Sequence, residues 1–108
     1  MIVCKDPVNS SFEIFTYGNG MITFRGATDV NSSTTISSMI GSWHQVVGTY
    51  DGSTMKIYID GALEGSTSIT NAIHTTAGDI EIGNGDHGTN GFNGLIDEVR
   101  IYNRALSS

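Results

Sequence analysis

The sequence predicts an all-β protein, and three observations carry this prediction. Val, Ile, Thr, Tyr and Phe, which favour strands, are frequent, whereas Ala, Leu, Lys and Glu are sparse. Turn residues, among them 14 glycines in 108 residues, interrupt the chain at short intervals, as in sandwiches and barrels. No segment has the sustained apolar spacing of a helix. One domain spanning residues 1–108 is expected, because the chain is too short for two.

Each strand is predicted from a run of alternating or apolar residues bounded by turn residues. The clearest is 54–60, in which Met55, Ile57 and Ile59 alternate with polar or amphipathic side chains. The glycines of 18–20 supply the positive φ that a tight hairpin needs. The predicted strands, in chain order, are 2–5, 11–17, 21–25, 43–50, 54–60, 79–82 and 95–102.

The segments between these strands are expected to be turns and loops. Asp51 and Asp60 each precede a glycine, so both are interpreted as turn residues that join the three strands of a meander. Residues 28–38 are rich in Ser and Thr and are expected to be a loop with a weak strand near 34–37. Residues 83–94 form a Gly- and Asn-rich loop, and 103–106 is expected to close with one helical turn.

Charge and hydropathy exclude several classes of protein. The net charge of −6, from 11 acidic and 5 basic residues, argues against binding to nucleic-acid backbones, which need a basic face. No apolar run is long enough for a transmembrane helix, and the first ten residues lack the apolar core of a signal peptide. Cys4 is the only cysteine, so it has no internal disulfide partner and is interpreted as an ordinary strand residue.

Three stretches together point to a known family. They read "WHQVVGTYDGSTMKIYIDGALEG", "DIEIGNG" and "FNGLIDEVRIYNRALS", with weaker support from "IVCK" and "GMITFRG" nearer the start. In their spacing the chain resembles the laminin-G-like domains of the concanavalin A-like lectin/glucanase superfamily. The resemblance implies an antiparallel jelly-roll sandwich of two curved sheets and an extracellular or cell-surface location.

The resemblance also implies that the N-terminal strands of such a jelly roll are missing here, because family domains carry strands ahead of "IVCK". The fold is therefore expected to be incomplete at that end, with unpaired edges beside the closing strand 95–102. A smaller sandwich can repack, a longer parent protein can supply the strands, or two copies can pair. The third outcome is favoured, so a homodimer joined through sheet edges is expected.

Asp97 is the first candidate site residue. On a regular strand it shares a face with Val99 and Ile101, so a core-facing strand would turn its carboxylate inward, where it needs a partner. The family often holds calcium near this strand, and the resemblance makes Asp97 a candidate calcium ligand. The alternative is that Asp97 accepts backbone N–H groups from a neighbouring loop.

The loop 83–94 is the second candidate site. It matches G-x-G-x-x-G in its first six residues, but no helix pattern follows, so a dinucleotide site is rejected. Its amide, carboxylate and imidazole groups suit sugar hydroxyls or a cation at the rim of the sandwich, with Asn93 as a further member. The candidate ligand-binding residues are Asn84, Asp86, His87 and Asn90.

No catalytic residue is assigned. Asp79 and Glu81 resemble the paired acids of the glucanases in the superfamily, but the position of the third acid holds Gly83. Trp43, the only Trp, is expected in the core, and the alternative of a sugar-stacking role would need it exposed on the concave face. The leading hypothesis is a lectin-like, non-catalytic module that recognises carbohydrate or protein within a larger extracellular protein. The alternatives are a structural, self-assembling domain and, with the weakest support, a glycoside hydrolase.

Overall fold

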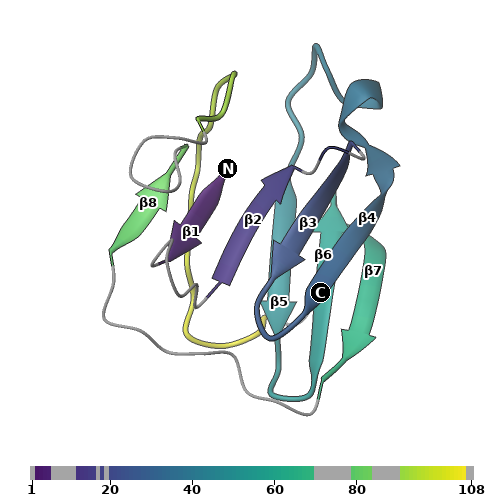
Figure 1. The fold of residues 1–108 in the computed structure, drawn as a ribbon, viewed down its shortest axis with the longest axis vertical. Helices are drawn as coiled ribbons and strands as arrows, with labels where there is room; N and C mark the ends of the chain where they lie inside the picture. The colour runs from purple at the N-terminus through teal and green to yellow at the C-terminus, as the bar shows by residue number, and fades with distance from the viewer. Residues whose placement is uncertain are drawn as a thin grey trace.

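A computed structural model describes residues 2–5, 12–16, 18, 20–69, 79–83 and 91–106. These residues form two antiparallel sheets that face each other (Figure 1), one with strand order β4-β3-β2-β1-β8 and one with order β5-β6-β7. The predicted all-β antiparallel sandwich is confirmed. The elements are β1 (Val3–Lys5), β2 (Phe12–Thr16), β3 (Met21–Arg25), β4 (Asp29–Thr35), the short 3-10 helix η1 (Ile36–Ser38), β5 (Val46–Tyr50), β6 (Thr54–Ile59), β7 (Ala62–Ser68) and β8 (Ile80–Ile82).

Strand alternation decides which side chains form the core. In β6, Met55, Ile57 and Ile59 are buried, while the residues between them are only partly buried. They pack against the inward side chains of β3 and β4 across the sandwich. Burying each such side chain contributes about 1.5–3 kcal/mol, which makes this cluster the main source of stability. The cluster comprises Ile22, Phe24, Val30, Met39, Met55, Ile57 and Ile59.

The sandwich is closed where β4 lies over β7. A Cβ atom added at Gly65 would collide with the carbonyl oxygen of Asn31 and lie 3.0 Å from Cγ1 of Val30, so only glycine permits this approach of the two sheets. Beside it, the carboxylate of Glu64 accepts hydrogen bonds from the backbone N–H of Thr34 (3.2 Å) and from the hydroxyl of Ser33. Glu64 thus occupies donors on the outer edge of β4, which blunts that edge against pairing with another chain.

The opposite side of the sandwich is open. Among the described residues, β5 pairs only with β6, and β8 pairs only with β1. The chain from 91 to 106 passes behind β1 in Figure 1, in yellow, without forming a strand. It is held at its start by a hydrogen bond from the N–H of Phe92 to the carbonyl of Gly83 (2.8 Å) and by Ile96, whose Cδ1 lies beside Gly83.

The prediction of a closing strand at 95–102 is therefore wrong. Glu98 has φ of +54°, in the left-handed region that interrupts an extended chain. Leu95, Val99 and Ile101, which were expected to alternate into a core, are exposed. An apolar alternating run becomes a strand only where an edge pairs with it, and no described strand pairs with this one. The expected helical turn at 103–106 is absent too.

The interpretation of 28–38 as a loop is also wrong, since most of it is β4. Val30 and Ser32 are buried on alternate positions, as a half-buried strand requires. The hydroxyl of Ser32 accepts the N–H of Ile22 (3.0 Å) and donates to the carbonyl of Thr34 (2.7 Å), so this buried polar group is satisfied. A strand with few apolar residues is thereby stabilised by its neighbour β3.

Both Asp-Gly pairs form the predicted turns. Asp51 Oδ1 accepts the backbone N–H groups of Ser53 (3.0 Å) and Thr54 (2.8 Å), and Gly52 has φ of +101°. Asp60 and Gly61 have φ of +50° and +83° and connect β6 directly to β7, the pattern of a two-residue hairpin turn. The meander of β5, β6 and β7 is confirmed.

Replacing Gly65 with alanine tests the closed side. We expect Gly65→Ala to lower the free energy of unfolding by about 1–3 kcal/mol, because the new methyl group overpacks a backbone contact that cannot give way. Urea denaturation followed by circular dichroism measures the change. Gly91→Ala is the control, since nothing lies within 4 Å of a Cβ at Gly91 and its φ is not positive. Equal stability of the two variants would contradict this account of the closed side.

The turn at Asp51 predicts a dependence of stability on pH. Hydrogen bonds from the amides of Ser53 and Thr54 lower the pKa of Asp51. A pKa that is lower in the folded state stabilises the protein above the unfolded pKa of about 4, and this contribution is lost as pH falls through the folded pKa. Asp51→Ala should therefore lower the melting temperature at neutral pH, and the gap to the parent protein should narrow in acid. Asp79→Ala, which removes an exposed carboxylate ahead of β8, is the control. A gap that stays constant with pH would refute the assignment.

Candidate functional site

The outward face of the five-stranded sheet carries a row of polar residues that crosses all of its strands. Cys4 lies opposite both Glu13 on β2 and Glu81 on β8. Glu13 lies opposite Arg25, and Arg25 opposite Asp29. Residues directly opposite one another on neighbouring strands share a face, so the register alone places all five on one side of the sheet. We call these residues, in strand order, the polar row: Asp29, Arg25, Glu13, Cys4 and Glu81.

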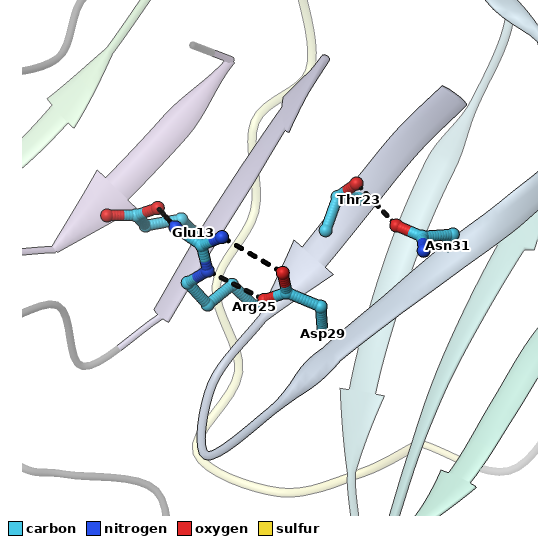
Figure 2. A network of polar contacts seen from close by, with 5 residues as sticks. All are labelled: Glu13, Thr23, Arg25, Asp29 and Asn31. Atoms are coloured by element: carbon cyan, nitrogen blue, oxygen red, sulfur yellow. Dashed lines mark hydrogen bonds and ion pairs between the residues drawn. The ribbon is translucent and has the colours of Figure 1, made fainter. Parts of the chain in front are cut away.

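Arg25 is the centre of this row. Its Nε and Nη2 donate to the two carboxylate oxygens of Asp29 at 2.6 and 2.9 Å, and its Nη1 lies 3.6 Å from Oε2 of Glu13, as Figure 2 shows. The guanidinium carbon also lies 4.7 Å from the centre of the Phe15 ring. A planar guanidinium held by a bidentate carboxylate and an aromatic ring has little freedom left to lose when it contacts a ligand.

A second pair of polar residues lies next to Arg25 on the same face. Thr23 is fully buried, and its hydroxyl donates to Oδ1 of Asn31 at 2.6 Å (Figure 2). Asn31 itself is exposed on β4. Because its carbonyl oxygen is engaged, the amide of Asn31 is oriented with its NH₂ group as the remaining donor.

The middle of the polar row is buried, whereas its β3–β4 end is accessible. Cys4 is fully buried, as the prediction of a strand residue requires, and Glu13 is 6% exposed. Arg25 and Asp29 have side chains that are 36% and 38% exposed, and Asn31 is exposed beside them. The accessible part of this face is therefore its β3–β4 end, which we call the β3–β4 site: Arg25, Asp29 and Asn31.

The β3–β4 site offers planar donor and acceptor groups at fixed positions. A guanidinium, a carboxylate and an amide can each contact adjacent hydroxyl groups of a neutral, hydroxyl-rich ligand. A metal centre has less support, because within the described residues no three His, Cys, Asp or Glu side chains gather as metal ligands would.

The predicted rim-loop residues lie outside the residues that the structure describes, so their roles stay predictions. These are Asn84, Asp86, His87 and Asn90. Asn93, the further member, is described and exposed.

Asp97 does not face the core as a regular strand would have placed it. It is exposed, outside any strand, and its Oδ1 accepts the backbone N–H of Glu98 at 2.8 Å. No group of acidic or histidine side chains surrounds it among the described residues. The described surroundings therefore do not add to the argument for a calcium ion, and calcium at Asp97 stays a prediction.

Trp43 was expected in the core, and this expectation is wrong. The residue is 66% exposed, in the connection between η1 and β5, because β5 begins only at Val46. Its neighbours are held in place by Asp60, whose two carboxylate oxygens accept the N–H of Gln45 (2.9 Å) and the Nδ1–H of His44 (2.7 Å). The hydrogen bond from His44 is the main cause of the lowered pKa of Asp60.

Sequence reasoning missed the β3–β4 site because it interpreted 28–38 as a loop. Once Asp29–Thr35 is known to be a strand beside β3, simple alternation places Asp29 and Asn31 on one face. The alternation of Asp29 and Asn31 is visible in the sequence, but it identifies a shared face only once the pairing of β4 with β3 is known. Asp79 and Glu81, the pair considered for catalysis, flank the start of β8, the first exposed and the second half-buried.

The chain is similar to one known protein family. A family model of laminin G type, described as the concanavalin A-like lectin/glucanases superfamily, matches residues 2–108. Searches of curated proteins and of solved structures returned no match. Domains of this family are typically non-catalytic binding modules and typically occur in extracellular proteins. Within the described residues, no helix is long and apolar enough to span a membrane. The match and the two-sheet sandwich agree with the resemblance in the sequence, and the chain belongs to the laminin-G-like family of the concanavalin A-like lectin/glucanase superfamily.

Proposed function

We propose that this protein is a non-catalytic recognition module that binds carbohydrate at the β3–β4 site, within a larger extracellular protein. The observation that carries the proposal is the ordered guanidinium of Arg25, fixed by Asp29 and Phe15 and flanked by Asn31. Membership of a family of binding modules supports the general class, and the chemistry of these side chains supports the choice of ligand.

A neutral sugar suits this site better than a charged ligand does. The Arg25 charge is already neutralised by Asp29 and approached by Glu13, so an anionic ligand would have to displace a carboxylate. The net charge of −6 also disfavours polyanions. Hydroxyl groups instead add hydrogen bonds to the remaining lone pairs of Asp29 and to the NH₂ group of Asn31, each worth about 0.5–1.5 kcal/mol net. A few such bonds on an open face correspond to weak binding, in the millimolar to micromolar range.

The rim-loop residues and calcium belong to the same proposal as secondary elements. Asn84, Asp86, His87 and Asn90 would extend the contact with a sugar chain, and a calcium ion at Asp97 would add a further oxygen-binding centre. Both ideas depend on the sequence pattern and on the family resemblance.

Self-association is the second candidate function, and the open side of the sandwich favours it. Large apolar side chains between 38% and 79% exposed occur on β8 and along 95–106. A soluble monomer rarely presents so many apolar side chains along one side, and a second copy that pairs there would cover them. We call these residues the open-side apolar set: Ile80, Ile82, Leu95, Val99, Ile101, Tyr102 and Leu106.

A glycan array followed by calorimetry tests carbohydrate binding. We expect at least one neutral glycan to bind, and Asn31→Ala to weaken its binding by about fivefold to tenfold, the loss of one or two hydrogen bonds. Arg25→Lys should weaken it further, since lysine cannot reproduce the bidentate contact. Ser66→Ala is the control, because it removes an exposed hydroxyl on β7, in the other sheet. An array without a binder, or an equal loss in Ser66→Ala, would refute the proposal.

Light scattering coupled to size-exclusion chromatography tests self-association. We expect a dimer at high micromolar concentration, and we expect Val99→Asp combined with Ile101→Asp to convert it to a monomer by placing charges in the contact. Leu63→Asp is the matched control, because Leu63 is 54% exposed on β7, outside the open-side apolar set. A parent protein that remains monomeric at these concentrations would rule out the dimer.

A further inference from the structure

The connection between β4 and β5 presents two large apolar side chains to water. Ile40 is 80% exposed and Trp43, the only Trp of the chain, is 66% exposed. Neither belongs to the core cluster, although Trp43 was expected in it. A tryptophan that does not contribute to the core at all is unusual in a domain this small, because Trp supplies more buried area than any other side chain.

The segment that carries these side chains is anchored at both ends. At its start, Met39 is buried in the core cluster, and its N–H donates to the carbonyl of Ile36 at 3.0 Å. At its end, Asp60 accepts hydrogen bonds from Gln45 and His44, and its own N–H donates to the carbonyl of Gln45 at 2.9 Å. The exposed ring is thus presented on a held backbone, which lowers the entropic cost of binding.

The two residues that follow Trp43 in the sequence, and the carboxylate that both of them bind, carry polar groups suited to hydroxyls. The bond from His44 to Asp60 uses Nδ1, which leaves Nε2 without a partner among the described residues. The Asp60 side chain is 51% exposed, and each of its oxygens has a lone pair beyond the bonds from His44 and Gln45. Gln45 is exposed as well, two residues after Trp43. An aromatic side chain together with imidazole, amide and carboxylate groups is the set that binds a sugar, whose C–H face stacks on the ring while its hydroxyls accept and donate hydrogen bonds.

We propose that Trp43 is the stacking platform of a second carbohydrate subsite, with His44, Gln45 and Asp60 contacting the hydroxyl groups of the same sugar ring. The ligand class rests on the proposed function, whereas the site itself rests on the geometry of this segment. It is separate from the β3–β4 site, because Asp29 begins β4 and the Trp43 segment follows the other end of that strand.

The size and charge of this site favour a sugar over larger occupants. Trp43 and Ile40 together expose on the order of 300 Å², well below the ~800 Å² that each partner contributes to a stable protein interface. The net charge of −6 and the adjacent Asp60 disfavour an anionic lipid surface. A pyranose ring covers one aromatic side chain and matches the patch.

Trp43 fluorescence tests the subsite directly, because the protein has no other Trp. Soluble hexasaccharides of β-linked glucose and of N-acetylglucosamine would be titrated into the full chain, with emission and calorimetry measured in parallel. We expect a saturable change of Trp43 emission with one of them, and an affinity at least about tenfold lower in Trp43→Ala. Trp43→Phe should retain most of the affinity, since a phenyl ring still stacks.

Tyr102→Ala is the matched control, because Tyr102 is another exposed aromatic residue, on the open side, and its loss should change neither affinity nor emission. Circular dichroism confirms that each variant is folded, and Ile40→Ser gives a second, milder disruption of the patch.

A sugar that binds by calorimetry with unchanged emission and equal affinity in Trp43→Ala overturns the subsite but leaves the proposed function standing. No binding of either hexasaccharide also overturns it, while the glycan array decides the proposed function separately. An emission change that occurs only with phosphatidylcholine vesicles would overturn the ligand class.

Discussion

The close approach of β4 to β7 at Gly65 is the contact on which the rest of the sandwich depends. Without a side chain at this position the two sheets come together at one border, and the inward residues of β3, β4 and β6 meet as a dry cluster. Glu64, the residue before it, binds the outer edge of β4 through Thr34 and Ser33. Gly65 and Glu64 therefore hold the free edge of β4 against β7. The other edge of β4 pairs with β3, and this strand carries Asp29 and Asn31.

The sequence predicted the fold where the information is local. Alternation identified β6, and the Asp-Gly pairs identified both turns of the meander, because each depends on a few adjacent residues. It failed where a partner decides the outcome. Residues 29–35 contain one large apolar residue and were interpreted mainly as a loop with a weak strand near 34–37, yet pairing with β3 makes all of them a strand. Residues 95–102 have strong local alternation but lack a paired edge, and the positive φ of Glu98 interrupts them.

The same distinction applies to the candidate sites. Arg25 meets Asp29 and Glu13 only through register across three strands, which a single sequence does not reveal until the strands are known. Trp43 looked like a core residue because large aromatic residues usually are, and its exposure depends on where β5 begins. The acids and amides of the Gly-rich loop were selected for their chemistry alone, and that criterion could not separate a ligand site from a loop.

The engagement of the β4 backbone by Glu64 has a consequence for assembly. A β-sandwich with two reactive borders can add subunits at each of them and grow without limit, whereas one with a single reactive border stops as soon as that border is covered. Here Glu64 on β7 occupies one backbone donor at the border of β4, whereas β5 and β8 have no second strand partner among the described residues. If copies associate through that second border, as proposed above, the carboxylate of Glu64 favours a closed dimer over open-ended growth.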